Sequence, residues 1–275
     1  MVTLTGFADE ISPDLEVQLD VLASEGISHL ELRGVWGKNV LELSDEEIDR
    51  VKARLDERGF KVSSIGSPIG KIKITDPFEP HIERFHRSVY VAKALNAPYI
   101  RIFSFFLPEG DEPSVYRSEA LSRMKRLARL AEREGVVLLH ENEKEIYGDN
   151  GERCLEILQA CDSPNVRAAF DPANFVQCGV RPMSEAYPLV KDYVAYFHIK
   201  DALMASGKVV PAGEGDGELN QVVAELGRLG YGGFLSLEPH LSAAETFQGF
   251  SGPELFVVAV KALKKLLAEA DIAWN

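Results

Sequence analysis

The sequence predicts a single (β/α)8 TIM barrel of the α/β class over residues 1–275. Short runs of β-branched and aromatic residues alternate about eight times with longer stretches of helical periodicity. Eight repeats in this length give about 34 residues per unit, which is the size of one βα repeat. No linker or low-complexity segment interrupts the series. A doubly wound open sheet is the alternative, and it is disfavoured because no GxGxxG motif follows the first apolar run.

The expected strands are short, as the strands of a parallel barrel with both faces buried should be. They cover residues 2–7, 29–32, 61–65, 99–103, 136–140, 168–170, 194–198 and 234–237.

Between these runs, apolar residues recur at spacings of three and four, which predicts amphipathic helices. The expected apolar faces are Leu15/Leu19/Leu22, Ile48/Val51/Leu55, Phe85/Val89/Ala92, Leu121/Met124/Leu127/Ala128, Val222/Val223/Leu226/Leu229 and Phe256/Ala259/Leu263/Leu266/Leu267. Ser44 and Glu47 have the spacing of a capping box at the start of the second helix. A glycine stands between a charged helical turn and the next strand at four places, where it can end the helix: Gly26, Gly59, Gly135 and Gly230.

The chain is acidic, with 30 Lys and Arg against 43 Asp and Glu and a formal charge of −13. An acidic surface without a long basic run works against nucleic-acid binding. No apolar run approaches the roughly 20 residues of a membrane-spanning helix, and the first ten residues lack the basic and apolar parts of a secretory signal. We therefore expect a cytoplasmic protein that binds neither nucleic acid nor a membrane. The three cysteines show no CxxC spacing, which favours reduced thiols.

Polar residues at the ends of four successive expected strands predict a metal site, because the active site of such a barrel lies at the carboxyl ends of its strands. The last four strands end in Glu141, Asp171, His198 and Glu238, which are 30, 27 and 40 residues apart, close to one repeat each. Each residue alone is explained as a helix N-cap or a buried polar residue, but four in phase with the repeat indicate convergence. Three carboxylates and one imidazole suit Mn²⁺, Mg²⁺, Fe²⁺ or Zn²⁺, and the oxygen-rich set favours Mn²⁺.

Five motifs carry a family resemblance: Leu139-His140-Glu141-Asn142, Phe170-Asp171-Pro172-Ala173-Asn174, His198-Ile199-Lys200-Asp201, the loop at residues 211–217, and Ser236-Leu237-Glu238. With them the sequence resembles the xylose isomerase-like TIM-barrel superfamily, in particular the sugar phosphate isomerase/epimerase group that includes ketose 3-epimerases and inosose dehydratases. The resemblance covers nearly the whole chain, from residues 6–10 to the last helix.

The resemblance implies that Glu141, Asp171, His198 and Glu238 bind one divalent ion, commonly Mn²⁺ in this group, with Mg²⁺, Zn²⁺, Fe²⁺ or Co²⁺ as alternatives. It also implies that Glu141 and Glu238 are an acid/base pair. Such a pair would move a proton next to a sugar carbonyl through an enediolate. A small sugar is then the expected substrate, and the family suggests a homodimer or homotetramer.

Two residues beside these ligands are candidates for binding the sugar. Asn174 matches a position at which relatives carry a substrate-contacting polar residue, and its alternative is a helix N-cap or turn. Lys200 is expected to steady a substrate oxygen or, alternatively, to pair with Asp201 at the barrel rim.

Further candidates lie on other loops. Arg101 and His240 are expected at the rim, where they would contact sugar hydroxyls or a phosphate. Trp36 would stack on a sugar face or cover the barrel mouth. Glu143 competes with Glu141 as the ligand after the fifth strand. Residues 213–217 lack the Lys-Ser/Thr of a P-loop, so they predict an active-site loop with unusual backbone angles and not a phosphate cradle.

One departure from the family pattern leaves the reaction open. Known ketose 3-epimerases carry an arginine shortly after the metal-binding histidine, whereas no arginine occurs here between His198 and Arg228, so that Lys200 or Lys208 would have to replace it. The alternative is a dehydratase or lyase, in which the enediolate of an inosose or a 3-keto-glycoside expels a β-substituent. An apurinic-site endonuclease would need a trinuclear zinc cluster with several further histidines and a basic groove. This chain has only six histidines and a net negative charge, which disfavours that function. A hydride-shift isomerase is disfavoured because it needs a second metal, for which this sequence lacks ligands. A non-catalytic barrel that binds a sugar or a partner protein is disfavoured because the set of four metal ligands is complete.

Overall fold

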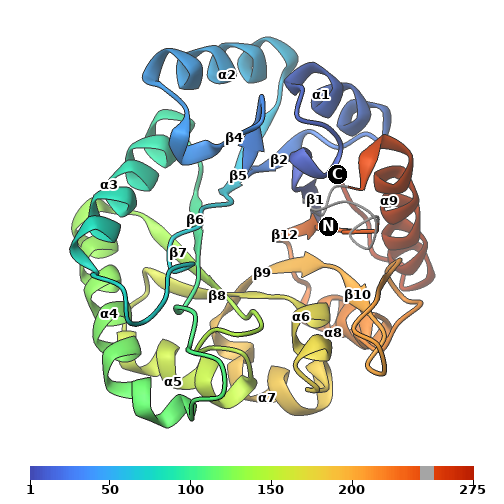
Figure 1. The fold of residues 1–275 in the computed structure, drawn as a ribbon. Coiled ribbons are helices and arrows are strands. Elements are labelled where there is room, and N and C mark those ends of the chain that lie inside the picture. Colours follow the sequence, from blue (N-terminus) through green and yellow to red (C-terminus); the bar gives the residue numbers. More distant parts are fainter. Residues whose placement is uncertain (242–250) are drawn as a thin grey trace.

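The computed structural model describes residues 1–241 and 251–275, and it contains a central ring of parallel strands surrounded by helices (Figure 1). The strand order in the eight-stranded sheet is β1-β12-β9-β8-β7-β6-β5-β2. A parallel bridge between Phe7 and Glu31 joins the two ends of this sheet. The predicted (β/α)8 barrel is confirmed.

Every expected strand is present with small shifts at its ends. The barrel strands are β1 (Thr3–Gly6), β2 (His29–Leu32), β5 (Lys61–Ile65), β6 (Tyr99–Ile102), β7 (Val137–Glu141), β8 (Val166–Phe170), β9 (Val194–Ile199) and β12 (Phe234–Leu237). Two short hairpins lie outside the barrel sheet, formed by β3 (Gly34–Val35) with β4 (Lys38–Asn39) and by β10 (Asp201–Ala202) with β11 (Val209–Val210). β8 begins earlier than expected, at Val166, and so includes the charged Arg167. A charged residue is tolerated at this position because its guanidinium donates to the carbonyl of Asp192 at 2.7 Å.

The helices that cover the barrel are α1 (Leu15–Ser24), α2 (Asp45–Arg58), α3 (Glu79–Ala94), α4 (Pro113–Glu134), α5 (Gly151–Cys161), α6 (Pro172–Gln177), α7 (Tyr187–Val190), α8 (Leu219–Leu229) and α9 (Gly252–Glu269). No apolar face was assigned in advance to α5, α6 or α7. In the long helices the expected apolar faces are buried, with one exception. Leu229 is 52% exposed, because it is the last residue of α8 and the chain turns away at Gly230, which has a left-handed backbone (φ 61°).

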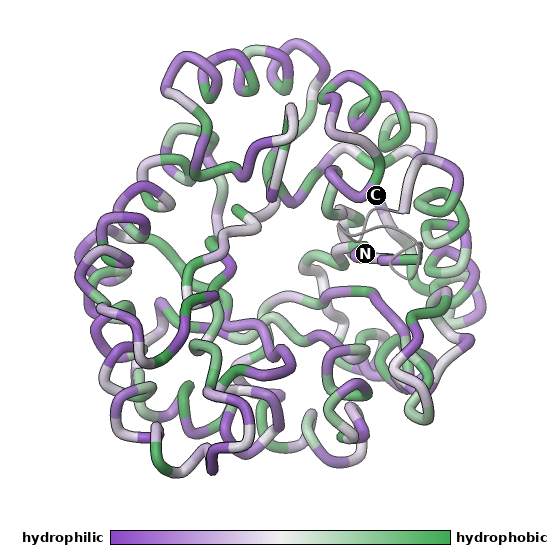
Figure 2. Tube along the Cα trace, in the orientation of Figure 1, coloured by the Kyte–Doolittle hydropathy of each residue, from purple (hydrophilic) through white to green (hydrophobic). Residues whose placement is uncertain are grey.

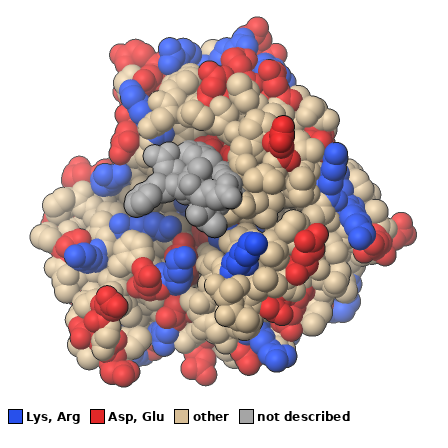
Figure 3. Space-filling model, turned by 45° about the vertical axis from the view of Figure 1, so that its right-hand side comes forward, with Lys and Arg blue, Asp and Glu red and all other residues tan. Residues whose placement is uncertain are grey.

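Hydrophilic and hydrophobic residues alternate around the outer helices (Figure 2), as amphipathic helices between a core and solvent should show. Ser44 and Glu47 form the predicted capping box, and Gly59 and Gly135 are left-handed C-caps as expected. The end of the chain returns to β1, where the amide of Leu4 donates to the carbonyl of Asn275 at 2.8 Å. No helix in the described part of the chain has the length and apolar character needed to cross a membrane. Basic side chains are interspersed with acidic ones on the face drawn in Figure 3.

The buried His81 of α3 makes the stability of the fold depend on pH. Its Nε2 accepts a hydrogen bond from the amide of Gly70 at 2.7 Å, which requires the neutral imidazole, and burial lowers the pKa of His81 from 6.5 to about 4. The unfolded chain therefore binds more protons between these values, so this contribution is present above pH 6.5 and lost as the pH falls to 4. As the pH falls from 6.5 to 4, the free energy of unfolding should decrease by about 2 to 3 kcal/mol more in the wild type than in His81→Gln. Urea denaturation at each pH measures this difference.

The exposed His86 on the same helix provides the control for this prediction. His86→Gln should follow the wild-type pH profile. A His81→Gln profile parallel to that of the wild type would contradict the assignment.

Candidate metal centre

Four buried side chains meet at the carboxyl end of the barrel strands. Glu141 ends β7, His198 lies in β9, and Asp171 and Glu238 directly follow β8 and β12. One ligand atom of each lies within 4.8 Å of the corresponding atoms of the other three. The structure thus brings together the four residues that the sequence suggested as ligands.

Local structure sets the direction of two of these side chains. Asp171 is the N-cap of α6, and its Oδ1 accepts from the amide of Asn174 at 2.8 Å, which leaves Oδ2 for the cluster. The Asn142 side chain accepts from the amide of Asp171 at 3.0 Å and donates to its carbonyl at 2.9 Å. Nδ1 of His198 lies 3.1 Å from Oε1 of Glu141 and 3.9 Å from Oδ2 of Asp171.

The donor set fits a divalent ion. Oε2 of Glu141, Oδ2 of Asp171 and Nδ1 of His198 are buried, and they face Arg101 at 3.2 Å, Lys200 at 3.0 Å and Oε1 of Glu141 at 3.1 Å, respectively. Three carboxylates and one imidazole gathered this closely in a buried site are a set of donors that a cation can hold together. Carboxylate oxygens with one imidazole nitrogen match the ligands of Mn²⁺, Mg²⁺, Fe²⁺ or Zn²⁺.

Neighbouring charges keep two of the carboxylates ionised. Burial raises the pKa of Glu141, but the charges of His198 and Arg101 outweigh it and bring that pKa to about 2. Burial also raises the pKa of Glu238, but Lys200 and other cations hold it well below the usual range. Asp171 differs, because burial and the nearby carboxylates raise its pKa to about 6 although Lys200 opposes them. Glu141 and Glu238 are therefore ionised at neutral pH.

Two predicted substrate-binding cations lie inside this cluster. Nζ of Lys200 is 3.0 Å from Asp171 and 3.0 Å from Glu238, so it does not pair with Asp201. Nη1 of Arg101 is 3.2 Å from Glu141 and 3.9 Å from Glu238. Arg101 was expected at the rim, but it belongs to β6 and is only 4% exposed.

Asn174 and His240 also contact members of the cluster. The side-chain Nδ2 of Asn174 donates to Oε1 of Glu141 at 3.2 Å. The backbone N–H of Asn174 donates to Oδ1 of Asp171, so this residue also takes part in the first turn of α6. Nε2 of His240 lies 3.0 Å from Glu10 and 3.5 Å from Glu238.

Glu143 and Trp36 lie apart from the cluster. The Glu143 carboxylate pairs with Lys71 at 3.2 Å, and Glu141, not Glu143, belongs to the cluster of four. The Trp36 ring, in the turn between β3 and β4, lies 3.8 Å from the guanidinium of Arg50 on α2. Stacking of Trp36 on a sugar stays a prediction.

A second layer of charge, not predicted from the sequence, surrounds Glu238. Arg33, the residue after β2, contacts Glu238 at 2.9 Å, Glu10 at 2.8 Å and Asp9 at 2.7 Å. Its position directly after a barrel strand is the one sequence signal that could have identified it.

The glycine-rich loop after β11 closes onto Asp201. The amides of Gly213, Gly215 and Gly217 donate to the Asp201 carboxylate at 2.9, 3.0 and 2.8 Å. A Cβ at Gly215 would lie 2.4 Å from Oδ1 of Asp201, so only glycine allows this approach. The loop therefore wraps a carboxylate of the chain and leaves these amides unavailable to a phosphate.

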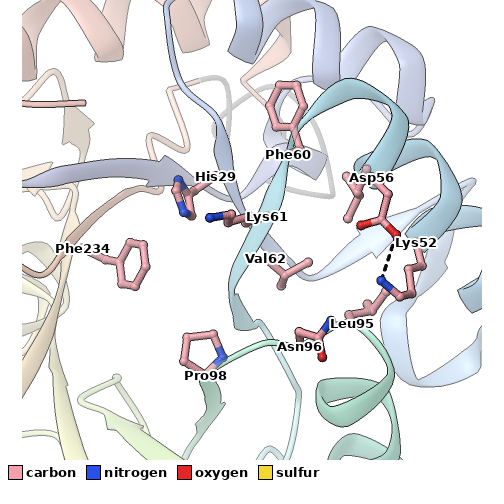
Figure 4. Close-up of a pocket in the computed structure, with 11 residues that line it drawn as sticks. His29, Lys52, Asp56, Phe60, Lys61, Val62, Leu95, Asn96, Pro98 and Phe234 are labelled. Carbon is pink, nitrogen blue, oxygen red and sulfur yellow. Dashed lines mark hydrogen bonds and ion pairs between the residues drawn. The ribbon is translucent and has the colours of Figure 1, made fainter.

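A separate pocket lies at the opposite end of the barrel, where strands begin (Figure 4). His29, Lys61 and Phe234, the first residues of β2, β5 and β12, line it. None of the predicted site residues lines this pocket.

The chain belongs to the xylose isomerase-like TIM barrel family, whose model matches residues 19–266. It is 21% identical over 176 residues to a 3-dehydroshikimate dehydratase of Bacillus anthracis, a match that covers 64% of this chain and 62% of the relative. It is 23% identical over 181 residues to a probable L-ribulose-5-phosphate 3-epimerase of Mycoplasma pneumoniae, covering 64% and 59%. The chain thus spans less than two thirds of the length of these two relatives. The crystal structure of a D-tagatose 3-epimerase-like protein superimposes with a TM-score of 0.79 at 17% identity, with 98% of each chain covered.

Proposed function

We propose that this protein is a divalent-metal-dependent sugar isomerase or epimerase that moves a proton next to a carbonyl through an enediolate. The observation that carries the proposal is the buried ligand cluster, in which two ionised carboxylates, Glu141 and Glu238, lie with ligand atoms within 4.8 Å of each other. The likeness to a probable L-ribulose-5-phosphate 3-epimerase supports the same class of reaction.

We propose Mn²⁺ for the cluster, where a bound ion would polarise the carbonyl and offset the negative charge of the enediolate. Glu141 takes the proton from the carbon next to the carbonyl, because its low pKa keeps it ionised at neutral pH. A proton returns on the opposite face of the sugar by way of Glu238, which takes it from the solvent and passes it to the enediolate. Lys200, Arg101 and Asn174 hold the substrate oxygens beside the two carboxylates.

The charges of the site favour an unphosphorylated sugar. Three permanently positive side chains meet six carboxylates in this cluster, Arg33, Arg101 and Lys200 against Asp9, Glu10, Glu31, Glu141, Asp171 and Glu238. A divalent ion brings this set close to neutrality and leaves no surplus positive charge for a phosphate.

Elimination is the second candidate function. The likeness to a 3-dehydroshikimate dehydratase favours it, as does the absence of an arginine between His198 and Arg228. The same abstraction by Glu141 would then be followed by cleavage of the β C–O bond, and the departing hydroxide would take up a proton to leave as water.

Proton exchange in D₂O tests the proposed function. The protein with Mn²⁺ is incubated with ketoses, inososes, 3-keto-glycosides and 3-dehydroshikimate, and the paramagnetic ion is removed before proton NMR. We expect the C–H signal next to the carbonyl of one substrate to disappear, and EDTA to abolish this loss because abstraction depends on the ion.

The product separates the two candidates. An epimer or isomer supports the first, and an alkene signal supports the second. Absence of exchange with every compound, from a protein that carries one ion per chain, would contradict both.

A further inference from the structure

A fully buried carboxylate lies behind the proposed metal-ligand histidine. Glu31 of β2 is 0% exposed, and Oε2 of this residue is 3.2 Å from Nε2 of His198. Within the described residues His198 is the only basic side chain that forms an ion pair with Glu31. Burying a carboxylate costs free energy unless an opposite charge and hydrogen bonds offset the loss of water. The burial of Glu31 against His198 therefore suggests that the carboxylate has a role at this histidine.

Hydroxyl groups hold this carboxylate in one position. Oε2 of Glu31 accepts from Oγ of Ser236 at 2.7 Å and from the phenol of Tyr196 at 3.1 Å. The Tyr196 oxygen also contacts Oγ of Ser63 at 2.9 Å, and Ser63 contacts Thr5 at 2.8 Å. Because these residues come from β12, β9, β5 and β1, the position of Glu31 is fixed by the barrel itself.

The other ring nitrogen of His198 faces the proposed ion ligands. Nδ1 is 3.1 Å from Oε1 of Glu141 and 3.9 Å from Oδ2 of Asp171, two of the carboxylates proposed to hold the ion. A ring nitrogen that carries a hydrogen cannot ligate a metal, so the tautomer decides which nitrogen binds. The Phe7 and Tyr196 rings pack edgewise on the imidazole, with centroids 5.2 and 5.7 Å away, which restrains the ring plane but not the tautomer.

We propose that Glu31 is a positioning residue for the metal centre. Its carboxylate accepts the hydrogen on Nε2 of His198, which leaves the lone pair on Nδ1 directed at the ion and makes the imidazole a stronger ligand. This inference rests on the proposed metal-dependent function.

The test compares the Mn²⁺ affinity of the wild type with those of Glu31→Gln and Glu143→Gln, measured by the electron paramagnetic resonance signal of free Mn²⁺. Glutamine keeps the size of the side chain and removes its charge, so we expect a 10- to 100-fold weaker affinity, the usual range for such partners of a ligand. Glu143→Gln makes the same change at a carboxylate that pairs with Lys71 and lies outside the cluster of four. It should bind Mn²⁺ within about threefold of the wild type.

Nitrogen-15 NMR of the Zn²⁺-loaded wild type supplies a readout that needs no variant. We expect His198 to carry its hydrogen on Nε2 and to ligate through Nδ1. Ligation through Nε2 would overturn the inference, and this result remains decisive if Glu31→Gln does not fold.

The outcomes separate this inference from the proposed function. A wild type that binds no divalent ion would overturn both. A wild type that binds Mn²⁺, with Glu31→Gln equally tight or Glu143→Gln equally weakened, would overturn only the role of Glu31.

Discussion

The Glu141→Gln variant should lose at least about 100-fold of its proton-exchange rate at saturating Mn²⁺, the usual scale for a general base. An amide keeps the size and an oxygen donor of the side chain, but it cannot accept the substrate proton. The loss should appear in kcat, because the ionised carboxylate acts in the chemical step. The measurement is the rate of C–H loss in D₂O, with metal content determined on the same samples.

Glu143 supplies a matched control for this experiment. It is the same residue type two positions away, and its carboxylate pairs with Lys71 at 3.2 Å, outside the cluster of the four proposed ligands. Glu143→Gln should keep the wild-type rate within about twofold, since it removes no group that the proposed chemistry uses. The reverse pattern, with an active Glu141→Gln and an inactive Glu143→Gln, would assign the base to Glu143.

The four proposed ligands could be identified from the sequence because each lies at the end of a locally recognisable strand. Barrel geometry makes the ends of successive strands neighbours, so spacing near one repeat is enough to predict convergence. The structure places ligand atoms of Glu141, Asp171, His198 and Glu238 within 4.8 Å of one another. The same local signals gave the eight barrel strands within a few residues.

The surrounding charges could not be predicted in this way. Arg33 contacts Glu238 across 205 positions of sequence, and this contact exists only because β1 and β2 close the barrel next to β12. Glu31 had a weak local signal, a charged residue inside a four-residue strand that is otherwise mostly apolar. Its contact with His198 spans 167 positions and depends on the same closure.

The connection between β8 and β9 was also missed, for a local reason. Pro172, Pro182 and Pro188 stand in the first turns of successive short helical segments. Proline is favoured in the first turn of a helix and interrupts a helix interior. The helical segments here are therefore too short to show the repeated apolar spacing by which the longer helices were predicted. The short α6 nevertheless matters for the site, because its N-cap is Asp171.

Replacing His198 by alanine should weaken Mn²⁺ binding by more than about 100-fold, since loss of a direct ligand should exceed the 10- to 100-fold cost of losing a ligand's partner. His198 is 0% exposed, and the variant would leave Glu141 and Glu31 without the histidine that contacts both. We therefore also expect a lower unfolding temperature for the metal-free variant. Equilibrium dialysis with metal analysis measures the affinity, and circular dichroism establishes that the barrel is folded.

His29→Ala is the matched control, because it removes a partly buried imidazole from the first residue of β2, at the end of the barrel opposite the proposed ligands. It should retain one ion per chain with wild-type affinity. If a folded His198→Ala also binds one ion per chain within threefold of the wild type, His198 is not a ligand. The three carboxylates would then hold the ion alone, and the position of Glu31 behind His198 would have no bearing on metal binding.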